Sequence, residues 1–163
     1  MEHDDNKPIS SPEEISHVKR REIQAPLVVA LIKGFAEELG YEKALGITAQ
    51  IIRKDAQSDG ERAGLEYGRD LKGLARVVRE IWCKDNGVVI DVLEESENVF
   101  AFNVTKCGYA EAYDRLGLKD FGACLSCNRD EPFAGAFGAN IRLSRTQTIV
   151  EGESHCDFRY TQE

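Results

Sequence analysis

The spacing of apolar residues changes from a helical to a strand-like period at Gly87, and this change constrains the fold more than any other feature. Before Gly87, apolar residues recur at intervals of three and four, as on one face of a helix. Beyond it, as over 99–105, they alternate with polar residues, which is typical of a strand with one buried face. The sequence therefore predicts an α+β fold. A helical half (1–87) packs on an antiparallel sheet of about four strands (88–163), and the 163 residues form a single domain.

Four helices are expected in the N-terminal half. Ser11 and Glu14 can form a capping box that begins the first helix, and Pro26 interrupts that helix or begins the next. Two further helices are predicted over Tyr41–Ala56 and from about Gly64 to Lys84. The second helix has an apolar residue at every fourth position, which predicts a buried face of Leu27, Leu31, Phe35 and Leu39.

In the C-terminal half, the sequence predicts strands with short helices between them. Period-two spacing predicts strands over Val88–Glu95, Val99–Thr105, Ile141–Val150 and Cys156–Thr161. Short helical segments are predicted over Cys107–Arg115 and Pro132–Phe137. Most aromatic residues and all the cysteines lie at or beyond Trp82, so a functional site is expected in this half.

Charge and hydropathy exclude two kinds of partner. Acidic side chains outnumber basic ones by 29 to 21, and the formal net charge of −8 repels nucleic-acid phosphates, so no nucleic-acid partner is expected. The longest apolar run, Ala25–Ile32, is far shorter than the roughly 20 residues of a membrane span, so no membrane partner is expected. The acidic start, Met1–Asp5, is unlike a signal peptide. These features predict a cytoplasmic protein.

The cysteines are the main source of candidate chemistry. Five of them in a chain without an export signal argue against a disulfide framework. They are therefore buried small residues, metal ligands or reactive thiols, and the sequence leaves the roles of Cys83 and Cys124 undecided.

Two clusters contain a thiol close to a carboxylate. Cys107 and Glu111 are four residues apart and would share a helix face, but a core cysteine followed by a solvated glutamate fits equally well. Cys124 and Cys127 have the C-x2-C spacing of a zinc or redox pair, with Asp130 three residues further on. Because no second pair follows, incidental thiols remain an alternative.

Two further clusters lie on the last two predicted strands. A strand arginine at Arg145 needs an acidic partner or an anionic ligand if it is buried, although a plain exposed arginine fits the pattern too. On the last strand, alternation places Cys156 on the aromatic core face and His155 and Asp157 on the opposite face. That opposite face could also be an ordinary surface ladder of charges.

Taken together, these motifs resemble the L-2-amino-thiazoline-4-carboxylic acid hydrolase family. The resemblance rests on Asn103–Glu111, Cys127–Asp130, Arg145–Thr148 and His155–Tyr160, and it spans roughly 99–161. It implies a hydrolase acting on the carbon–nitrogen bonds of a cyclic amidine, or of a related small heterocycle. The reaction opens the thiazoline ring to give N-carbamoyl-L-cysteine, and a general acid must assist departure of the ring sulfur.

The resemblance also implies roles for particular residues. Arg145, with Thr146 and Tyr109, is expected to bind the substrate, whose carboxylate would meet the arginine. Either Cys107 or Cys127 attacks the ring carbon, or a metal activates water. The full set of candidate catalytic residues is Cys107, Glu111, Cys127, Asp130, His155, Cys156 and Asp157. No cofactor is certain, but Cys107, Cys127 and Cys156 would favour zinc as soft ligands.

Two readings without turnover stay open. The helical half followed by a sheet ending in Cys156, Phe158 and Tyr160 is also similar to vinyl-reductase-type domains, which bind small molecules or metals without catalysis. A structural or interaction domain with buried cysteines is the third reading. The partner expected from the resemblance is a small-molecule substrate, and the sequence leaves open whether the chain forms a homo-oligomer.

Overall fold

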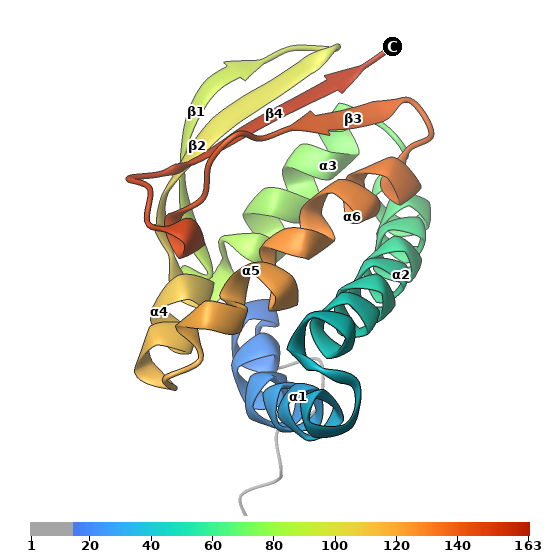
Figure 1. Cartoon of the computed structure of the whole chain (residues 1–163). Coiled ribbons are helices and arrows are strands. Elements are labelled where there is room, and N and C mark those ends of the chain that lie inside the picture. Colours follow the sequence, from blue (N-terminus) through green and yellow to red (C-terminus); the bar gives the residue numbers. More distant parts are fainter. Residues whose placement is uncertain (1–14) are drawn as a thin grey trace, which may run out of the picture.

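The computed structural model describes residues 15–163 and has the α+β architecture that the sequence predicts (Figure 1). Its helices are α1 (His17–Leu39), α2 (Tyr41–Tyr67), α3 (Leu71–Val77), α4 (Gly108–Arg115), α5 (Gly122–Leu125) and α6 (Asp130–Phe137). A π-helix (Val78–Trp82) continues α3. The strands are β1 (Val88–Glu95), β2 (Val99–Cys107), β3 (Ile141–Ser144) and β4 (Cys156–Gln162).

The sheet is antiparallel, with strand order β1-β2-β4-β3, and the helices lie on one side of it (Figure 1). Alternation along β4 buries Cys156, Phe158 and Tyr160, as expected. Phe158 pairs with Phe102 across the β2–β4 ladder, and their rings stack with centroids 5.1 Å apart. The central core therefore lies between this aromatic face and α3 and α6, which pack on it.

The helix α2 is longer than predicted, and its glycines explain the error. The sequence predicts a helix end at Ala56 and a new start at Gly64, but α2 runs unbroken to Tyr67. A Cβ at Gly60 would lie 2.3 Å from the Phe133 carbonyl oxygen, and one at Gly64 equally close to that of Phe137. The two glycines thus let the α6 backbone lie directly against α2. The predicted fourth helix begins only after Gly68, with Asp70 capping α3.

The helix α1 corrects two predictions. Pro26 lies inside a continuous helix and neither ends nor begins one. The face with apolar residues every fourth position is exposed, with Leu27 at 68% and Phe35 at 54%. The buried face is made instead by the smaller Ala25 and Val29, together with Ile32. The helix begins after an N-cap at Ser16, whereas the predicted start near Ser11 lies outside the described residues.

The third strand is shorter than predicted because the backbone beyond it donates hydrogen bonds to a carboxylate and not to a neighbouring strand. Strand β3 ends at Ser144, and the backbone N–H groups of Thr146 and Gln147 both donate to Asp157, at 2.9 Å each. The following turn, Ile149–Glu151, is capped by Thr148. The extended stretch after β3 therefore carries Arg145 out of the sheet toward α6. Over residues 15–163, no helix combines the length and apolarity needed to cross a membrane.

Candidate active site

A pocket of about 370 Å³ lies between the inner face of the sheet and the helices. Residues from both halves of the chain line it. They come from the start of α1, the C-terminal part of α2, the π-helix, the end of β2, the turn before α6 and the start of β4. Five of the predicted site residues form one part of its lining, which we call the thiol wall: Cys107, Cys127, Asp130, Arg145 and Cys156. Tyr109, a sixth, also lines the pocket.

Cys107 is the N-cap residue of α4. It ends β2, and its Sγ accepts a hydrogen bond from the backbone N–H of Ala110 at 3.4 Å. Burial raises the pKa of this thiol above its ordinary value, and the backbone N–H groups of Ala110 and Tyr109 oppose that rise without cancelling it, so Cys107 is mainly protonated at neutral pH. A helix N-terminus favours a thiolate, as at many nucleophilic cysteines. Among the thiols of the pocket, Cys107 has the most support from backbone donors for a negative charge.

The other two thiols of the wall stay protonated at neutral pH. Burial, followed by the charge of Asp130, raises the pKa of Cys127 to about 12. Burial also raises the pKa of Cys156 to about 11, although its Sγ accepts a hydrogen bond from the Ile149 N–H at 3.2 Å. Since the thiolate is the reactive form, these two cysteines are poorer nucleophiles than Cys107.

A mostly buried ion pair lies beside the thiols. Arg145 pairs with Asp130, donates to the carbonyl oxygen of Cys127 at 3.2 Å, and lies 5.2 Å from the ring centroid of Phe158. The predicted need of Arg145 for an acidic partner is therefore met by Asp130. Burial raises the pKa of Asp130 to about 6, with Arg145 opposing the shift. A carboxyl group with that pKa can both accept and donate protons near neutral pH.

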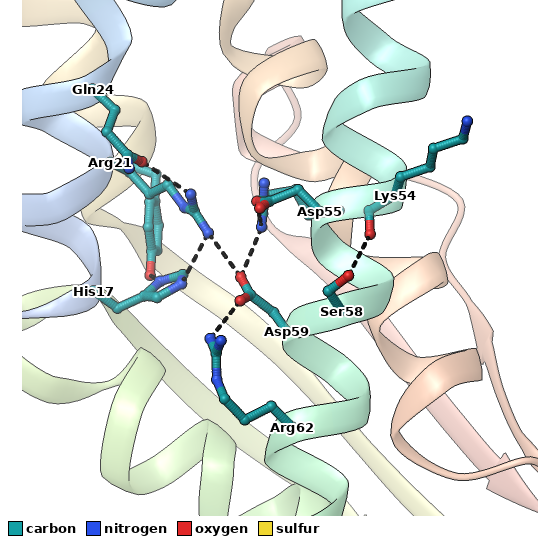
Figure 2. Close-up of polar contacts among 10 residues, drawn as sticks. His17, Arg21, Gln24, Lys54, Asp55, Ser58, Asp59 and Arg62 are labelled. Carbon is teal, nitrogen blue, oxygen red and sulfur yellow. Dashed lines mark hydrogen bonds and ion pairs between the residues drawn. The ribbon is translucent and has the colours of Figure 1, made fainter.

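A polar cluster that the sequence analysis missed lies beside the thiol wall, and all but one of its residues come from the helical half of the chain (Figure 2). We call it the helix cluster; it consists of His17, Arg21, Asp55, Asp59, Arg62 and Arg129. Asp59 accepts from Arg21, Arg62 and Arg129, whose N···O distances are 3.4, 2.6 and 2.9 Å. The one available signal was spacing: His17 and Arg21, like Asp55 and Asp59, are four apart and share a helix face.

His17 joins the helix cluster to the residues next to Cys107. Its Nδ1 lies 2.7 Å from the Tyr109 hydroxyl, and its Nε2 lies 3.4 Å from Arg21. Burial, with the positive charges of Arg21 and Arg129, lowers the pKa of His17 to about 4. His17 is therefore neutral at physiological pH, and its Nδ1 can donate a hydrogen bond to the Tyr109 hydroxyl or accept one from it without adding charge.

Four predicted site residues do not line the pocket. Glu111 is half exposed and pairs with Lys106 at 3.5 Å, while Cys107 precedes the helix as its cap. Thr146 and Asp157 bond to each other, with 2.6 Å between the hydroxyl and the carboxylate. Burial raises the pKa of Asp157, but hydrogen bonds from Thr146 and Gln147 outweigh this and leave it lowered.

His155, the fourth, lies beside Gln147 and Ser154 rather than at the pocket. Cys83 and Cys124 are partly buried and line no part of it either. Within residues 15–163, no three His, Cys, Asp or Glu side chains are arranged to hold a metal ion. Cys107, Cys127 and Cys156 are therefore not arranged as a set of zinc ligands in this structure, and zinc binding stays a prediction.

The fold and the pocket define an α+β protein whose helices and sheet enclose a pocket lined by thiols and a buried ion pair. The chain belongs to the L-2-amino-thiazoline-4-carboxylic acid hydrolase family, whose model matches residues 20–160. This confirms the resemblance and extends it over most of the helical half. A search of curated proteins finds no match.

Among solved structures, the chain is similar to a trafficking protein particle complex subunit 3 from Naegleria fowleri, described as covalently bound to palmitic acid. The TM-score is 0.52 at 11% sequence identity, and the match covers 88% of this chain and 95% of that chain. At such low identity, the similarity concerns the fold alone.

Proposed function

We propose that the protein hydrolyses a cyclic amidine, with 2-amino-thiazoline-4-carboxylate as the first substrate to test. The family is the starting point, and the observation that carries the proposal is one pocket in which Cys107, at a helix N-terminus, shares the lining with Asp130. The charge of Asp130 contributes to the raised pKa of the Cys107 thiol, so the two groups interact. A nucleophile beside a base is the arrangement that covalent hydrolysis requires.

In the first step, ionised Asp130 accepts the proton of Cys107 as the sulfur bonds to the ring carbon between sulfur and nitrogen. The carbon–sulfur bond of the ring then breaks, and Asp130 returns the proton to the departing sulfur. The result is an open chain attached to Cys107 through the former ring carbon, which keeps both of its nitrogens.

In the second step, Asp130 accepts a proton from water, whose oxygen bonds to the same carbon. The Cys107 sulfur leaves and takes back a proton from Asp130, while the remaining hydroxyl proton moves to the doubly bonded nitrogen as the new carbonyl forms. The carbon has then gained one oxygen and kept both nitrogens, so the product is N-carbamoyl-L-cysteine. One water is consumed overall, and no redox partner is needed.

Arg145 has two roles in this scheme. Its contact with Asp130 keeps that carboxylate oriented, and its guanidinium has donors beyond those used on Asp130 and the Cys127 carbonyl. Those donors can meet the substrate carboxylate. The hydroxyl of Tyr109, fixed by His17, is proposed as a second substrate contact.

The test is incubation with 2-amino-thiazoline-4-carboxylate, followed by mass spectrometry for a product one water heavier. We expect wild-type protein to form it, Cys107→Ser to lose turnover by at least 10²-fold, and Cys83→Ser, outside the pocket, to keep it. A parallel sample treated with chelator tests the zinc prediction. Full activity of Cys107→Ser would contradict the proposed nucleophile.

A second candidate is a binding domain without turnover, in line with the alternative drawn from the sequence. Its supporting observation is the raised pKa of all three thiols of the wall, Cys107, Cys127 and Cys156, since protonated thiols are poor nucleophiles. Saturable binding of the thiazoline, with no released product and no change in the mass of the intact protein, would favour this candidate.

A further inference from the structure

The proposed reaction leaves one part of the pocket unused: a set of apolar side chains that we call the apolar wall. Its members are Ala63, Tyr67, Ile81, Trp82 and Phe133, all of which line the cavity. Each of them packs against the central core yet is only partly buried. Because all five line the cavity, a ligand that covers the apolar surface they leave open there gains free energy from its burial.

An irregular helix builds this wall. After α3, the N–H of Cys83 donates to the carbonyl oxygen of Val78, five residues back, at 2.9 Å. Such π-helical insertions are rare and occur frequently at functional sites. A turn closed by a bond to the fifth residue back contains one residue more than an α-helical turn. Ile81 and Trp82 therefore point in directions that a regular α-helix would not give them. The Trp82 ring meets Phe133 of α6, with 5.5 Å between centroids and planes tilted by 60°.

The size of the cavity gives the second part of the argument. A volume of about 370 Å³ lies in the range of pockets that hold drug-sized ligands. A single five-membered ring with one amino group and one carboxylate is smaller than such a ligand. Its polar groups also find their partners on the thiol wall, at Arg145 and Asp130, and not on Trp82 or Phe133.

We infer that the preferred substrates are cyclic amidines with an apolar substituent, which is held against Ile81, Trp82 and Phe133. This inference rests on the proposed hydrolase function. An aromatic substituent fits best, because tilted and edge-to-face ring contacts add to the burial of apolar area. The amidine ring then faces Cys107, while the substituent fills the remainder of the pocket.

The chain offers a direct reporter for this inference, because Trp82 is its only tryptophan. Intrinsic fluorescence can therefore follow binding at the apolar wall whether or not any substrate is hydrolysed. We would titrate wild-type protein with 2-amino-thiazoline-4-carboxylate and with its 5-phenyl derivative. The expected result is a Kd at least tenfold lower for the phenyl derivative, with a shift of the Trp82 emission.

Two variants keep the reporter and reduce the wall. Phe133→Ala and Ile81→Ala should each reduce the preference for the phenyl derivative to about threefold or less. Phe35→Ala removes an aromatic side chain that is 54% exposed on α1, outside the pocket, and should keep the full preference. Thermal unfolding identifies any variant that fails to fold, and Phe133→Leu then replaces Phe133→Ala.

The outcomes separate this inference from the hydrolase proposal. Equal Kd values for the two compounds overturn the inference, even if both are hydrolysed. A tenfold preference that persists in both Phe133→Ala and Ile81→Ala also overturns it. A preference that these variants remove, without any product one water heavier, supports the apolar wall and counts against the hydrolase.

Discussion

The thiol wall and the helix cluster line the same pocket but are built in different ways. The thiol wall comes from short segments near the end of the chain, where Asp130 and Arg145 are 15 residues apart. The helix cluster joins α1, α2 and the turn before α6, and Arg129 is 74 residues from its partner Asp55. The thiol wall contains the groups proposed to bond covalently to the substrate and to transfer protons. The helix cluster contains paired charges, and it contacts Tyr109 through His17 and the turn that carries Cys127 through Arg129.

The largest predicted effect is on turnover, and it distinguishes Asp130 from Glu111, two carboxylates that the sequence nominated equally. Asp130→Asn removes the proposed proton carrier, and we expect kcat/KM to fall by 10² to 10⁴-fold. Glu111→Gln changes a half-exposed carboxylate outside the pocket and should leave turnover within about twofold. Hydrolysis of the thiazoline, measured for both variants and the wild type, makes the comparison.

The pH profile sharpens the same test. Ionised Asp130 is the proposed base and its pKa is about 6, so kcat/KM should rise about tenfold per pH unit below pH 6 and level off above it. Residual activity of Asp130→Asn should lack this rise. A loss of activity in Glu111→Gln as large as in Asp130→Asn would place the chemistry outside the pocket.

The next effect concerns the contact between α2, which carries Asp59, and α6, which carries Asp130. Gly60→Ala places a Cβ 2.3 Å from the Phe133 carbonyl oxygen, where only backbone movement can relieve the clash. We expect a loss of about 2–3 kcal/mol in the free energy of unfolding. Gly46→Ala, in the same helix, has no atom within 4 Å of the new Cβ and should gain about 0.5–1 kcal/mol.

Chemical denaturation of the two glycine variants measures both changes. If Gly60→Ala and Gly46→Ala changed the free energy of unfolding by the same amount, the α6 backbone would not lie directly against Gly60 of α2. Activity should follow stability in this pair, because displacement of α6 moves Asp130 away from the thiols.

The same contrast explains what sequence reasoning found and what it missed. Alternation predicted the buried face of β4, because side chains on a strand point to fixed sides and Cys156 could only join Phe158. In α1, the same kind of reasoning selected the wrong face. Leu27 and Phe35 are larger and more apolar than Ala25 and Val29, but the close approach of neighbouring elements favours the smaller residues.

For the site, local motifs were enough to nominate Cys107, Cys127 and Asp130, which the structure brings to one pocket. They also nominated Asp157, whose carboxylate is used on the backbone of the loop after β3. The pairing of His17 with Tyr109 spans 92 residues, and no local pattern encodes a contact at that distance. Only the packing of α1 against α4 creates it.

The last effect we predict comes from that contact. His17 has a pKa of about 4 in the folded protein, below its ordinary value of 6.5. The unfolded chain therefore binds more protons than the folded one between these values, and the stability due to neutral His17 is lost as pH falls from 7 toward 4. Between pH 7 and pH 5, wild-type protein should lose about 2 kcal/mol relative to His17→Gln, which cannot titrate there.

Urea denaturation of both proteins at the two pH values measures this difference directly. The opposite slope expected from Asp130, whose pKa is raised, is common to both proteins and cancels in the comparison. Arg62→Gln alters a largely exposed side chain of the helix cluster, adds no titrating group and should behave as wild type. If His17→Gln and wild type lost stability in parallel, His17 would not be buried against Tyr109. The helix cluster would then be a surface feature, and the thiol wall would act without its support.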